Sequence, residues 1–155
     1  MARDSKPFDL VRLFAALADP TRLRLLNLMS GREVCVCYFV EILKEEQPKI
    51  SRHLAYLRNA GIVIARREGK WMHYSIQRPD DERASSILDA TLESFKTDRE
   101  MQADLSRLDR ACCAPGKIIA RWRVHLSLNL YLHEGNFNHV VVHADNLLRC
   151  RTWSN

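Results

Sequence analysis

Five cysteines are the side chains with the most distinctive chemistry in this chain of 155 residues. Cys35 and Cys37 are separated by one residue, Cys112 and Cys113 are adjacent, and Cys150 lies near the end. Neither spacing is the Cys-x-x-Cys of a thioredoxin-like redox motif, and an odd number of thiols does not predict a disulfide framework. We therefore expect the thiols to be ligands, sensors or small buried apolar residues.

Positive charge is the second distinctive feature, because it is concentrated in the middle of the chain. The net charge is +5, residues 47–76 contain six Lys or Arg against a single Glu, and residues 78–110 contain six basic against nine acidic residues. A basic segment of this kind is typical of a nucleic-acid-binding surface, because each neutralised phosphate releases a condensed counterion. A solvated charged surface is the alternative that charge alone leaves open.

The periodicity of apolar residues places both features on a mostly helical frame with a small β wing. We expect α-helices over residues 7–17, 20–30, 36–44 and 49–59. Pro48 interrupts the helical pattern between the last two, which predicts a helix-turn-helix. Two β-prone runs over residues 62–67 and 71–76 flank Gly69 and predict a hairpin, which is a wing when it follows a helix-turn-helix.

A DNA-binding surface follows from this arrangement. The second helix of a helix-turn-helix enters the major groove with its N-terminal part, where arginine reads guanine and Ser, Lys or His contacts a base or a phosphate. Basic residues of a wing reach the backbone or the adjacent minor groove. We predict DNA contacts from Lys49, Ser51, Arg52, His53, Tyr56, Arg66, Arg67 and Lys70.

The remaining half of the chain holds a long helix and a tail of different character. The helix is predicted over residues 79–108, and its apolar stripe must pack on another surface, for which a second subunit is the expected partner. Residues 124–133 alternate with a period of two, which predicts a β-hairpin or, failing that, a disordered tail. We divide the chain into a winged-helix domain over 1–111 and a tail over 112–155 that contains the Cys112/Cys113 pair and has no assigned role.

Several classes of protein are excluded by what the sequence lacks. No apolar run reaches the roughly 18 residues that a spanning helix needs, and the first residues have no apolar stretch of a signal peptide. Glycine-rich phosphate loops, paired carboxylates in a plausible site and Ser/His/Asp arrangements of known spacing are also missing. We therefore expect a cytoplasmic binding protein that has no membrane partner and is not an enzyme.

Four segments, taken in order, resemble the arsenic-responsive ArsR family of repressors. They are residues 17–26 (LADPTRLRLL), 33–37 (EVCVC), 47–54 (QPKISRHL) and 69–74 (GKWMHY). The resemblance extends over about residues 8–110. It implies a homodimeric winged helix-turn-helix repressor of a metalloid-resistance operon, joined through its first and last helices, that binds operator DNA without a cofactor and releases it when an inducer binds.

The resemblance also implies a role for the thiols. Cys35 and Cys37 match two inducer-binding thiols of the family, and As(III) or Sb(III) is a soft ion that thiolates favour. Val40 stands where many arsenic-responsive members carry a third Cys, so we expect Cys112 and Cys113 to supply further sulfur. Side chains two apart on a regular α-helix point about 200° away from each other, so inducer capture should distort the start of the third helix.

Two other functions stay open at this point. Four thiols equally suit a tetrahedral site for cadmium, lead or zinc, so a repressor with the same DNA contacts would respond to such an ion or to thiol oxidation. From another class, a metalloid-scavenging protein would use the thiols without binding DNA. Release of operator DNA by arsenite or by cadmium separates the first two, and salt-dependent binding to a promoter fragment excludes the scavenger.

Overall fold

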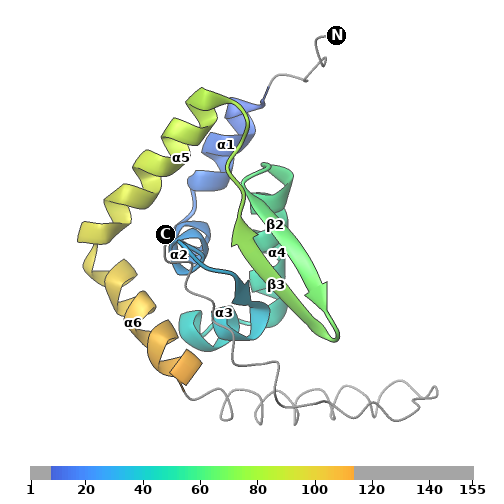
Figure 1. The fold of residues 1–155 in the computed structure, drawn as a ribbon, viewed down its shortest axis with the longest axis vertical. Coiled ribbons are helices and arrows are strands. Elements are labelled where there is room, and N and C mark those ends of the chain that lie inside the picture. Colours follow the sequence, from blue (N-terminus) through green and yellow to red (C-terminus); the bar gives the residue numbers. More distant parts are fainter. Residues whose placement is uncertain (1–7, 114–155) are drawn as a thin grey trace, which may run out of the picture.

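Short α-helices and a small antiparallel sheet build residues 8–113, the part of the chain that this computed structural model describes (Figure 1). The elements are α1 (Leu10–Leu17), α2 (Pro20–Leu28), β1 (Val34–Cys35), α3 (Val36–Leu43), α4 (Gln47–Asn59), β2 (Val63–Glu68), β3 (Trp71–Ile76), α5 (Glu82–Ser94), the 3-10 helix η1 (Phe95–Thr97) and α6 (Arg99–Cys113). The predicted winged-helix class is confirmed. None of the helices described is both long and apolar enough to cross a membrane. The hairpin predicted for the tail lies outside the described residues.

Aspartate caps fix the first two helices. Asp9 accepts a hydrogen bond from the Arg12 amide at 3.1 Å, and Asp19 accepts one from the Arg22 amide at 2.9 Å. Each bond satisfies an amide that the first turn of a helix leaves unpaired. Pro20 occupies the start of α2, as the sequence predicted, because its missing N–H costs nothing there.

The sheet has the order β1-β3-β2, and its hairpin β2–β3 is the wing. The two strands are joined by Gly69 and Lys70, and Gly69 has a φ of 59°, which a residue without a Cβ adopts easily. Strand β1 was not predicted. It pairs with β3, with Val34 opposite Tyr74 and Cys35 opposite His73, so the segment before α3 is joined to the wing.

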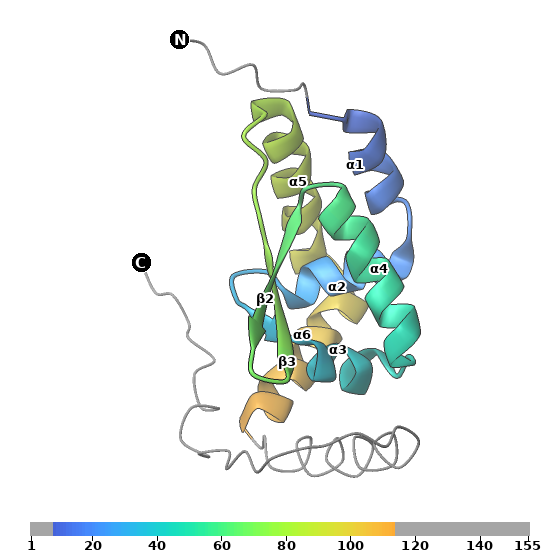
Figure 2. The ribbon, with the colours of Figure 1, turned by 90° about the vertical axis from the view of Figure 1, so that its right-hand side faces the viewer.

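The apolar core surrounds α2, which lies between the wing with α4 on one side and α5 with α6 on the other (Figures 1 and 2). The fully buried side chains of this core come from all six of the described α-helices. They include Leu13, Leu25, Leu26, Leu28, Phe39, Ile50, Leu54, Leu57, Leu88 and Leu108. The apolar faces of α3 and α4 therefore meet in one continuous core, which fixes the position of the helix-turn-helix.

The single long helix predicted over residues 79–108 is wrong. The chain turns through η1, and Asp98 then adopts an extended conformation and caps α6 by accepting the Met101 amide at 2.9 Å. Phe95 is buried in the bend. The bend allows α6 to pack on α2 and α3, which a straight continuation of α5 would miss (Figure 1). In the sequence, the stripe of apolar residues shifts to another face of the helix between Phe95 and Met101, which is where the structure has this break.

A buried polar contact joins α2 to α6. The Arg24 guanidinium donates to both carboxylate oxygens of Asp104, at 2.6 and 2.8 Å, and Arg107 also contacts this carboxylate. The Asn27 side-chain amide donates to the Met101 carbonyl at 2.7 Å. The side chain of Asp104 is fully buried, so these partners replace the water that the carboxylate gives up on folding.

Candidate thiol site and DNA-binding surface

The side chains of Cys35 and Cys37 meet at the junction of β1 and α3. Their sulfur atoms are 3.0 Å apart, and the Cys37 thiol donates to the Cys35 sulfur. Both are free thiols and both residues are buried, with exposed fractions of 7% and 5%. The pair is thus preassembled inside the apolar core.

This geometry shows that the two side chains do not point away from each other as expected, so α3 need not unwind to bring the sulfurs together. The expectation assumed that both cysteines are helical. Cys35 instead is the N-cap of α3, with an extended backbone (φ −71°, ψ 142°), and only Cys37 lies within the first turn. The change of backbone conformation between the two residues turns the Cys35 side chain toward that of Cys37.

The hydrogen bond between the thiols shifts their pKa values in opposite directions. Donation from Cys37 lowers the pKa of the Cys35 thiol. The same hydrogen bond, together with burial and the charge on Cys35, raises the pKa of the Cys37 thiol well above its ordinary value. The pair therefore holds one thiolate more readily than an isolated buried cysteine does, and gives up its second proton only to a ligand that replaces it.

Of the other two predicted ligands, Cys112 and Cys113, the structure describes the side chain of one. Cys112 is half-buried near the end of α6, whereas the side chain of Cys113 lies outside the described part of the chain. Among the described residues, no set of three or more Cys, His, Asp or Glu side chains is arranged to hold a metal ion. Ligation by Cys112 and Cys113 therefore stays a prediction.

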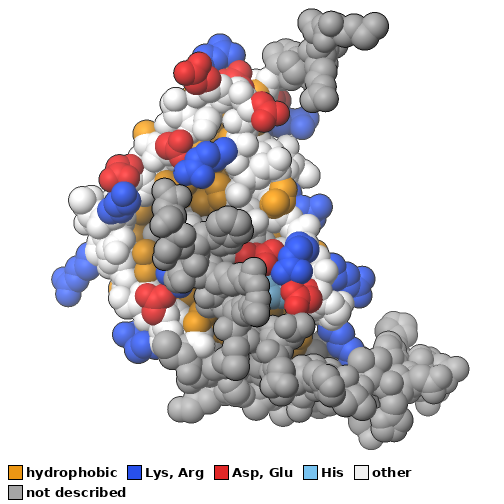
Figure 3. Space-filling view, in the orientation of Figure 1, with side chains coloured by type: hydrophobic (Ala, Val, Ile, Leu, Met, Phe, Trp, Pro, Cys, Tyr) orange, Lys and Arg blue, Asp and Glu red, His pale blue; other side chains and the backbone are white. Residues whose placement is uncertain are grey.

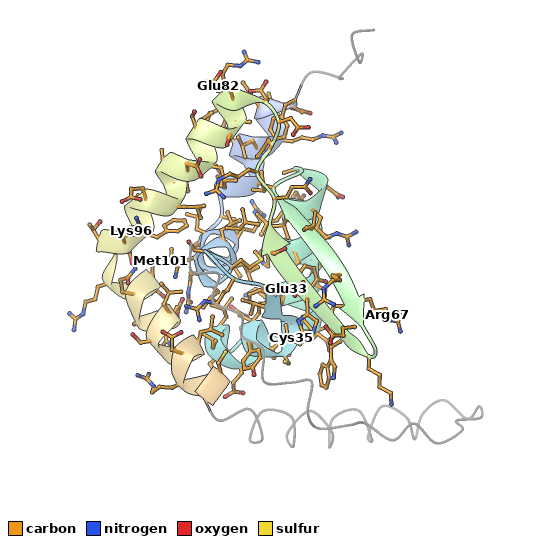
Figure 4. The ribbon with its side chains drawn as sticks, in the orientation of Figure 1. Glu33, Cys35, Arg67, Glu82, Lys96 and Met101 are labelled. Carbon is orange, nitrogen blue, oxygen red and sulfur yellow. The ribbon has the colours of Figure 1, made fainter. Side chains whose placement is uncertain are left out.

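The thiol pair is connected to both elements that were predicted to contact DNA. Helix α3, which begins beside Cys35, packs on α4. Strand β1 continues the wing sheet, and Glu33 immediately before it receives two hydrogen bonds from Arg66 of β2, at 2.8 and 3.0 Å. Figure 4 shows Glu33 and Cys35 beside the hairpin, with Arg67 projecting from its far edge.

Helix α4 presents three of its predicted contact residues to solvent. Ser51, Arg52 and Tyr56 are exposed, and the exposed fraction of Tyr56 is 59%. The opposite face buries Ile50, Leu54 and Leu57. This amphipathic division leaves the N-terminal half of α4 free to face a major groove.

Two other predicted contacts of α4 have partners within the protein. Lys49 forms an ion pair with Glu45 at 2.7 Å. His53 is only 17% exposed at its side chain, and its Nδ1 lies 3.5 Å from the carboxylate of Asp19, the N-cap of α2. The predicted role of His53 in DNA contact stays untested, but its position shows that it also packs α4 against the start of α2.

The wing carries its basic residues on the surface. Arg66 is paired with Glu33 and with Glu68, and these carboxylates raise its pKa. The Arg67 Nε donates to the Gly69 carbonyl at 3.0 Å, and Lys70 is exposed at the turn. On the face shown in Figure 3, basic and acidic side chains alternate around the wing, so its positive charge is partly balanced.

Arg22 is a residue that the sequence argument missed. Its guanidinium donates to the carbonyls of Ala15 and Ala16 at 2.7 and 2.6 Å, and lies 4.9 Å from the centre of the Tyr56 ring. It therefore joins α1, α2 and α4. No spacing in the sequence predicts these contacts, because the partners of Arg22 are backbone carbonyls and a residue on another helix.

Comparison with known proteins agrees with this geometry. Residues 19–65 match the family described as bacterial regulatory protein, arsR family. The chain is 41% identical over 106 residues to the arsenical resistance operon repressor of Escherichia coli (strain K12), covering 67% of this chain and 88% of that protein. It is 36% identical over 84 residues to the cadmium resistance transcriptional regulatory protein CadC homolog of Staphylococcus aureus, covering 54% of this chain and 67% of that protein.

A solved structure shares the fold. HlyU from Vibrio cholerae N16961 superposes with a TM-score of 0.50 and 25% sequence identity, over 57% of this chain and 92% of that chain. The fold of the described residues is thus found in a solved structure.

Proposed function

This chain belongs to the ArsR family of bacterial regulatory proteins, and we propose that it is a repressor whose operator DNA is released when As(III) or Sb(III) binds Cys35 and Cys37. Its relatives are transcriptional repressors rather than enzymes, which favours this function over metalloid scavenging. The observation that carries the proposal is the pair of buried sulfurs, 3.0 Å apart, at the start of the helix that packs on α4.

The chemistry of the pair fits a trivalent metalloid. Each thiol replaces one hydroxyl group of As(OH)₃ and releases one water, so two As–O bonds become two As–S bonds without net release of a proton. Soft sulfur favours this exchange, and the Cys35 thiol, whose pKa is lowered by Cys37, starts the attack as the better nucleophile. Cys112 and Cys113 are proposed as the source of a further sulfur.

Capture must also move the two sulfurs. Two thiolates bound at about 2.3 Å in a tetrahedral metal site lie roughly 3.8 Å apart, so an ion of similar bond length spreads a pair that stands at 3.0 Å. The core around them is close-packed and transmits such a displacement. It reaches α4 through α3 and the wing through β1, and a ligand that favours the displaced arrangement weakens DNA binding by linkage.

Operator DNA would be held by α4 and the wing. The exposed side chains of Ser51, Arg52 and Tyr56 are proposed to contact the major groove, and those of Arg67 and Lys70 the backbone or minor groove. Lys49, His53, Arg66 and Arg67 would share or leave the partners that they have in the protein.

A homodimer is the proposed assembly, through the first and last helices. Val11 and Phe14 on α1 are exposed by 78% and 54%, which leaves apolar side chains on an outer face of this helix. A second copy would cover them and place two recognition helices for two half-sites. We retain the proposed division into a winged-helix unit over 1–111 and a tail over 112–155, although α6 itself continues to Cys113.

A soft divalent cation is the second candidate inducer, favoured by the resemblance to the cadmium-resistance regulator of Staphylococcus aureus. The two candidates differ in proton balance. A divalent cation binds thiolates and releases both thiol protons, one of them from Cys37 with its raised pKa, so its affinity rises with pH. Arsenite takes up the same protons in water, so its affinity depends far less on pH while it remains As(OH)₃.

The test is DNA release measured by fluorescence anisotropy on a fragment from upstream of the protein's own gene. Arsenite should release the wild type, and C35S or C37S should need on the order of a hundredfold more arsenite. C150S is the matched control and should behave as wild type. The C112S/C113S double variant should weaken induction without changing DNA affinity if these thiols ligate. Arsenite that leaves the wild type bound would refute the proposal.

A further inference from the structure

The end of α1, the start of α2 and the middle of α4 meet at a single side chain, that of Arg22. It is largely buried, with 12% of its side chain exposed. Its Nε and Nη2 donate to the Ala16 and Ala15 carbonyls at 2.6 and 2.7 Å. These carbonyls belong to the last turn of α1, where the helix dipole favours a cation. The guanidinium is therefore held firmly in one orientation.

The Arg22 guanidinium lies over the Tyr56 ring. The Arg22 Cζ is 4.9 Å from the centre of the Tyr56 ring, which is within the range of a cation–π contact. Tyr56 is nevertheless 59% exposed. Arg22 thus supports the ring from the protein side, while much of it faces solvent on the same surface of α4 as Arg52.

We propose that Arg22 is a positioning residue for DNA recognition, which fixes the Tyr56 ring on α4 in the orientation that contacts the operator. This inference rests on the proposed function, because it presupposes operator binding through α4. A side chain that is already ordered loses less entropy when it is immobilised in an interface. Tyrosine offers both a hydroxyl for phosphate and an apolar ring edge for a thymine methyl.

The geometry favours positioning over direct contact with phosphate. Two nitrogens of Arg22 are engaged with carbonyls, and the side chain is largely covered, whereas a phosphate contact needs donors at the surface. Lysine cannot replace it, because a compact ammonium neither donates in two fixed directions nor stacks as a plane on an aromatic ring. The conservative R22K variant therefore removes the support while keeping the charge.

The experiment measures the affinity for the upstream DNA fragment in a double-mutant cycle of wild type, R22K, Y56L and R22K/Y56L. We expect R22K to weaken binding by about threefold to tenfold in the wild-type background. In the Y56L background it should change affinity by less than about twofold, since the ring that it positions is gone. Urea unfolding of the same four proteins shows whether each remains folded at the assay conditions.

Two further measurements separate positioning from other roles. R22M should leave the slope of log affinity against log salt unchanged, whereas loss of a direct phosphate contact lowers that slope by about one. In protein labelled with 3-fluorotyrosine, R22K should shift the ¹⁹F resonance assigned to Tyr56 by its loss in Y56F. The resonance of the distant, buried Tyr74 is the internal control.

An equal effect of R22K in both backgrounds, a lower salt slope in R22M, or an R22K protein with wild-type affinity would each overturn the positioning role. Absence of binding by the wild type would instead remove the repressor function together with this inference. The two failures are distinguishable, because only the second is seen without any substitution.

Discussion

Two pairs of side chains in the interior, Arg24–Asp104 and Cys35–Cys37, differ in how completely their bonding capacity is used. Asp104 accepts from Arg24 through both oxygens and contacts Arg107, and no buried side-chain nitrogen or oxygen in the described part of the chain lacks a hydrogen-bond partner. The thiols contact each other at 3.0 Å and remain free. The ion pair uses its bonding capacity in the fold, whereas the thiol pair keeps capacity for a ligand.

This difference separates a structural site from a functional one by chemistry rather than by position. Asp104 and both cysteines are buried, and both pairs involve a helix that packs on α6. A fully paired carboxylate gains nothing from a further ligand, and removal of its partner leaves a buried charge unpaired. A pair of soft sulfurs gains two strong bonds from a thiophilic ion. Substitutions in the two pairs should therefore have opposite consequences for stability and for induction.

The largest expected effect is on stability, from D104N. Asparagine keeps the shape of the side chain but cannot balance the charge of Arg24, which keeps an ion pair with the exposed Glu100 at 3.3 Å, so we expect the free energy of unfolding to fall by about 2 kcal/mol. Arsenite should still release DNA at the wild-type concentration. Urea unfolding measures the first effect, and the anisotropy assay measures the second in the conditions where the variant is folded.

The matched control is D109N, another aspartate of α6 that pairs with an arginine. Asp109 contacts Arg32 at 2.7 Å, but its side chain is 59% exposed. An exposed pair of this kind contributes little, so D109N should change the free energy of unfolding by less than about 1 kcal/mol. Equal losses in D104N and D109N would show that burial does not distinguish the two ion pairs.

The same ion pair should also make the stability of the protein depend on pH at acidic pH. Burial favours the protonated form of Asp104, but the hydrogen bonds from Arg24 and Arg107 outweigh it and hold the pKa of this carboxyl below its ordinary value of 3.8. Its stabilisation is therefore present above the pKa of the unfolded chain and is lost as the pH falls through the lower pKa of the folded state. Below about pH 4, the free energy of unfolding should fall more steeply in wild type than in D104N. Parallel pH profiles would contradict this account.

Thiol substitutions should show the reverse pattern, with a smaller effect on stability. C37S places a hydroxyl in a buried site that still has a neighbouring polar atom, so the free energy of unfolding should fall by about 1 kcal/mol. Induction should nevertheless need on the order of a hundredfold more arsenite. Urea unfolding and DNA release are measured on the same preparation, and C35S serves as the companion variant. A loss of several kcal/mol would mean that the thiols are as structural as the ion pair.

Sequence periodicity predicted the elements whose signals are local. Pro48 and the apolar face of α4 located the helix-turn-helix, and Gly69 located the wing turn. Strand β1 was missed because two residues cannot display a period. The break near Phe95 was missed because both helices are amphipathic on their own, and only the change of register between them, together with the capping residue Asp98, reports the bend.

The candidate site was predicted by residue type, but its geometry was not. A Cys-x-Cys sequence identifies two thiols without showing that a strand ends at Cys35, and this ending brings the sulfurs together. Charge likewise predicted a basic DNA-binding surface, yet it could not show that Glu33 and Glu68 pair with Arg66. Contacts between residues far apart in sequence have no local signal, as the pairing of Arg66 with Glu33, 33 residues earlier, illustrates.

The smallest expected effect concerns the proton shared within the thiol pair. The hydrogen bond from Cys37 lowers the pKa of Cys35, against burial, which raises it. C37A removes the donor and leaves burial, so the pKa of the Cys35 thiol should rise. The measurement is the ultraviolet absorbance of the thiolate against pH, in a background where Cys112, Cys113 and Cys150 are serine. C37S is the matched control, because its hydroxyl can still donate to the sulfur.

The wild-type pair should form one thiolate at a lower pH than C37A does, and its second only at much higher pH, because the pKa of Cys37 is raised. Two thiolates that appear together would mean that the sulfurs do not share a proton. They would then be two independent buried thiols, and the contrast with Arg24–Asp104 would lose its physical basis. A single early thiolate instead leaves the pair charged and polarisable inside an apolar core, where only a thiophilic ion can complete its bonding.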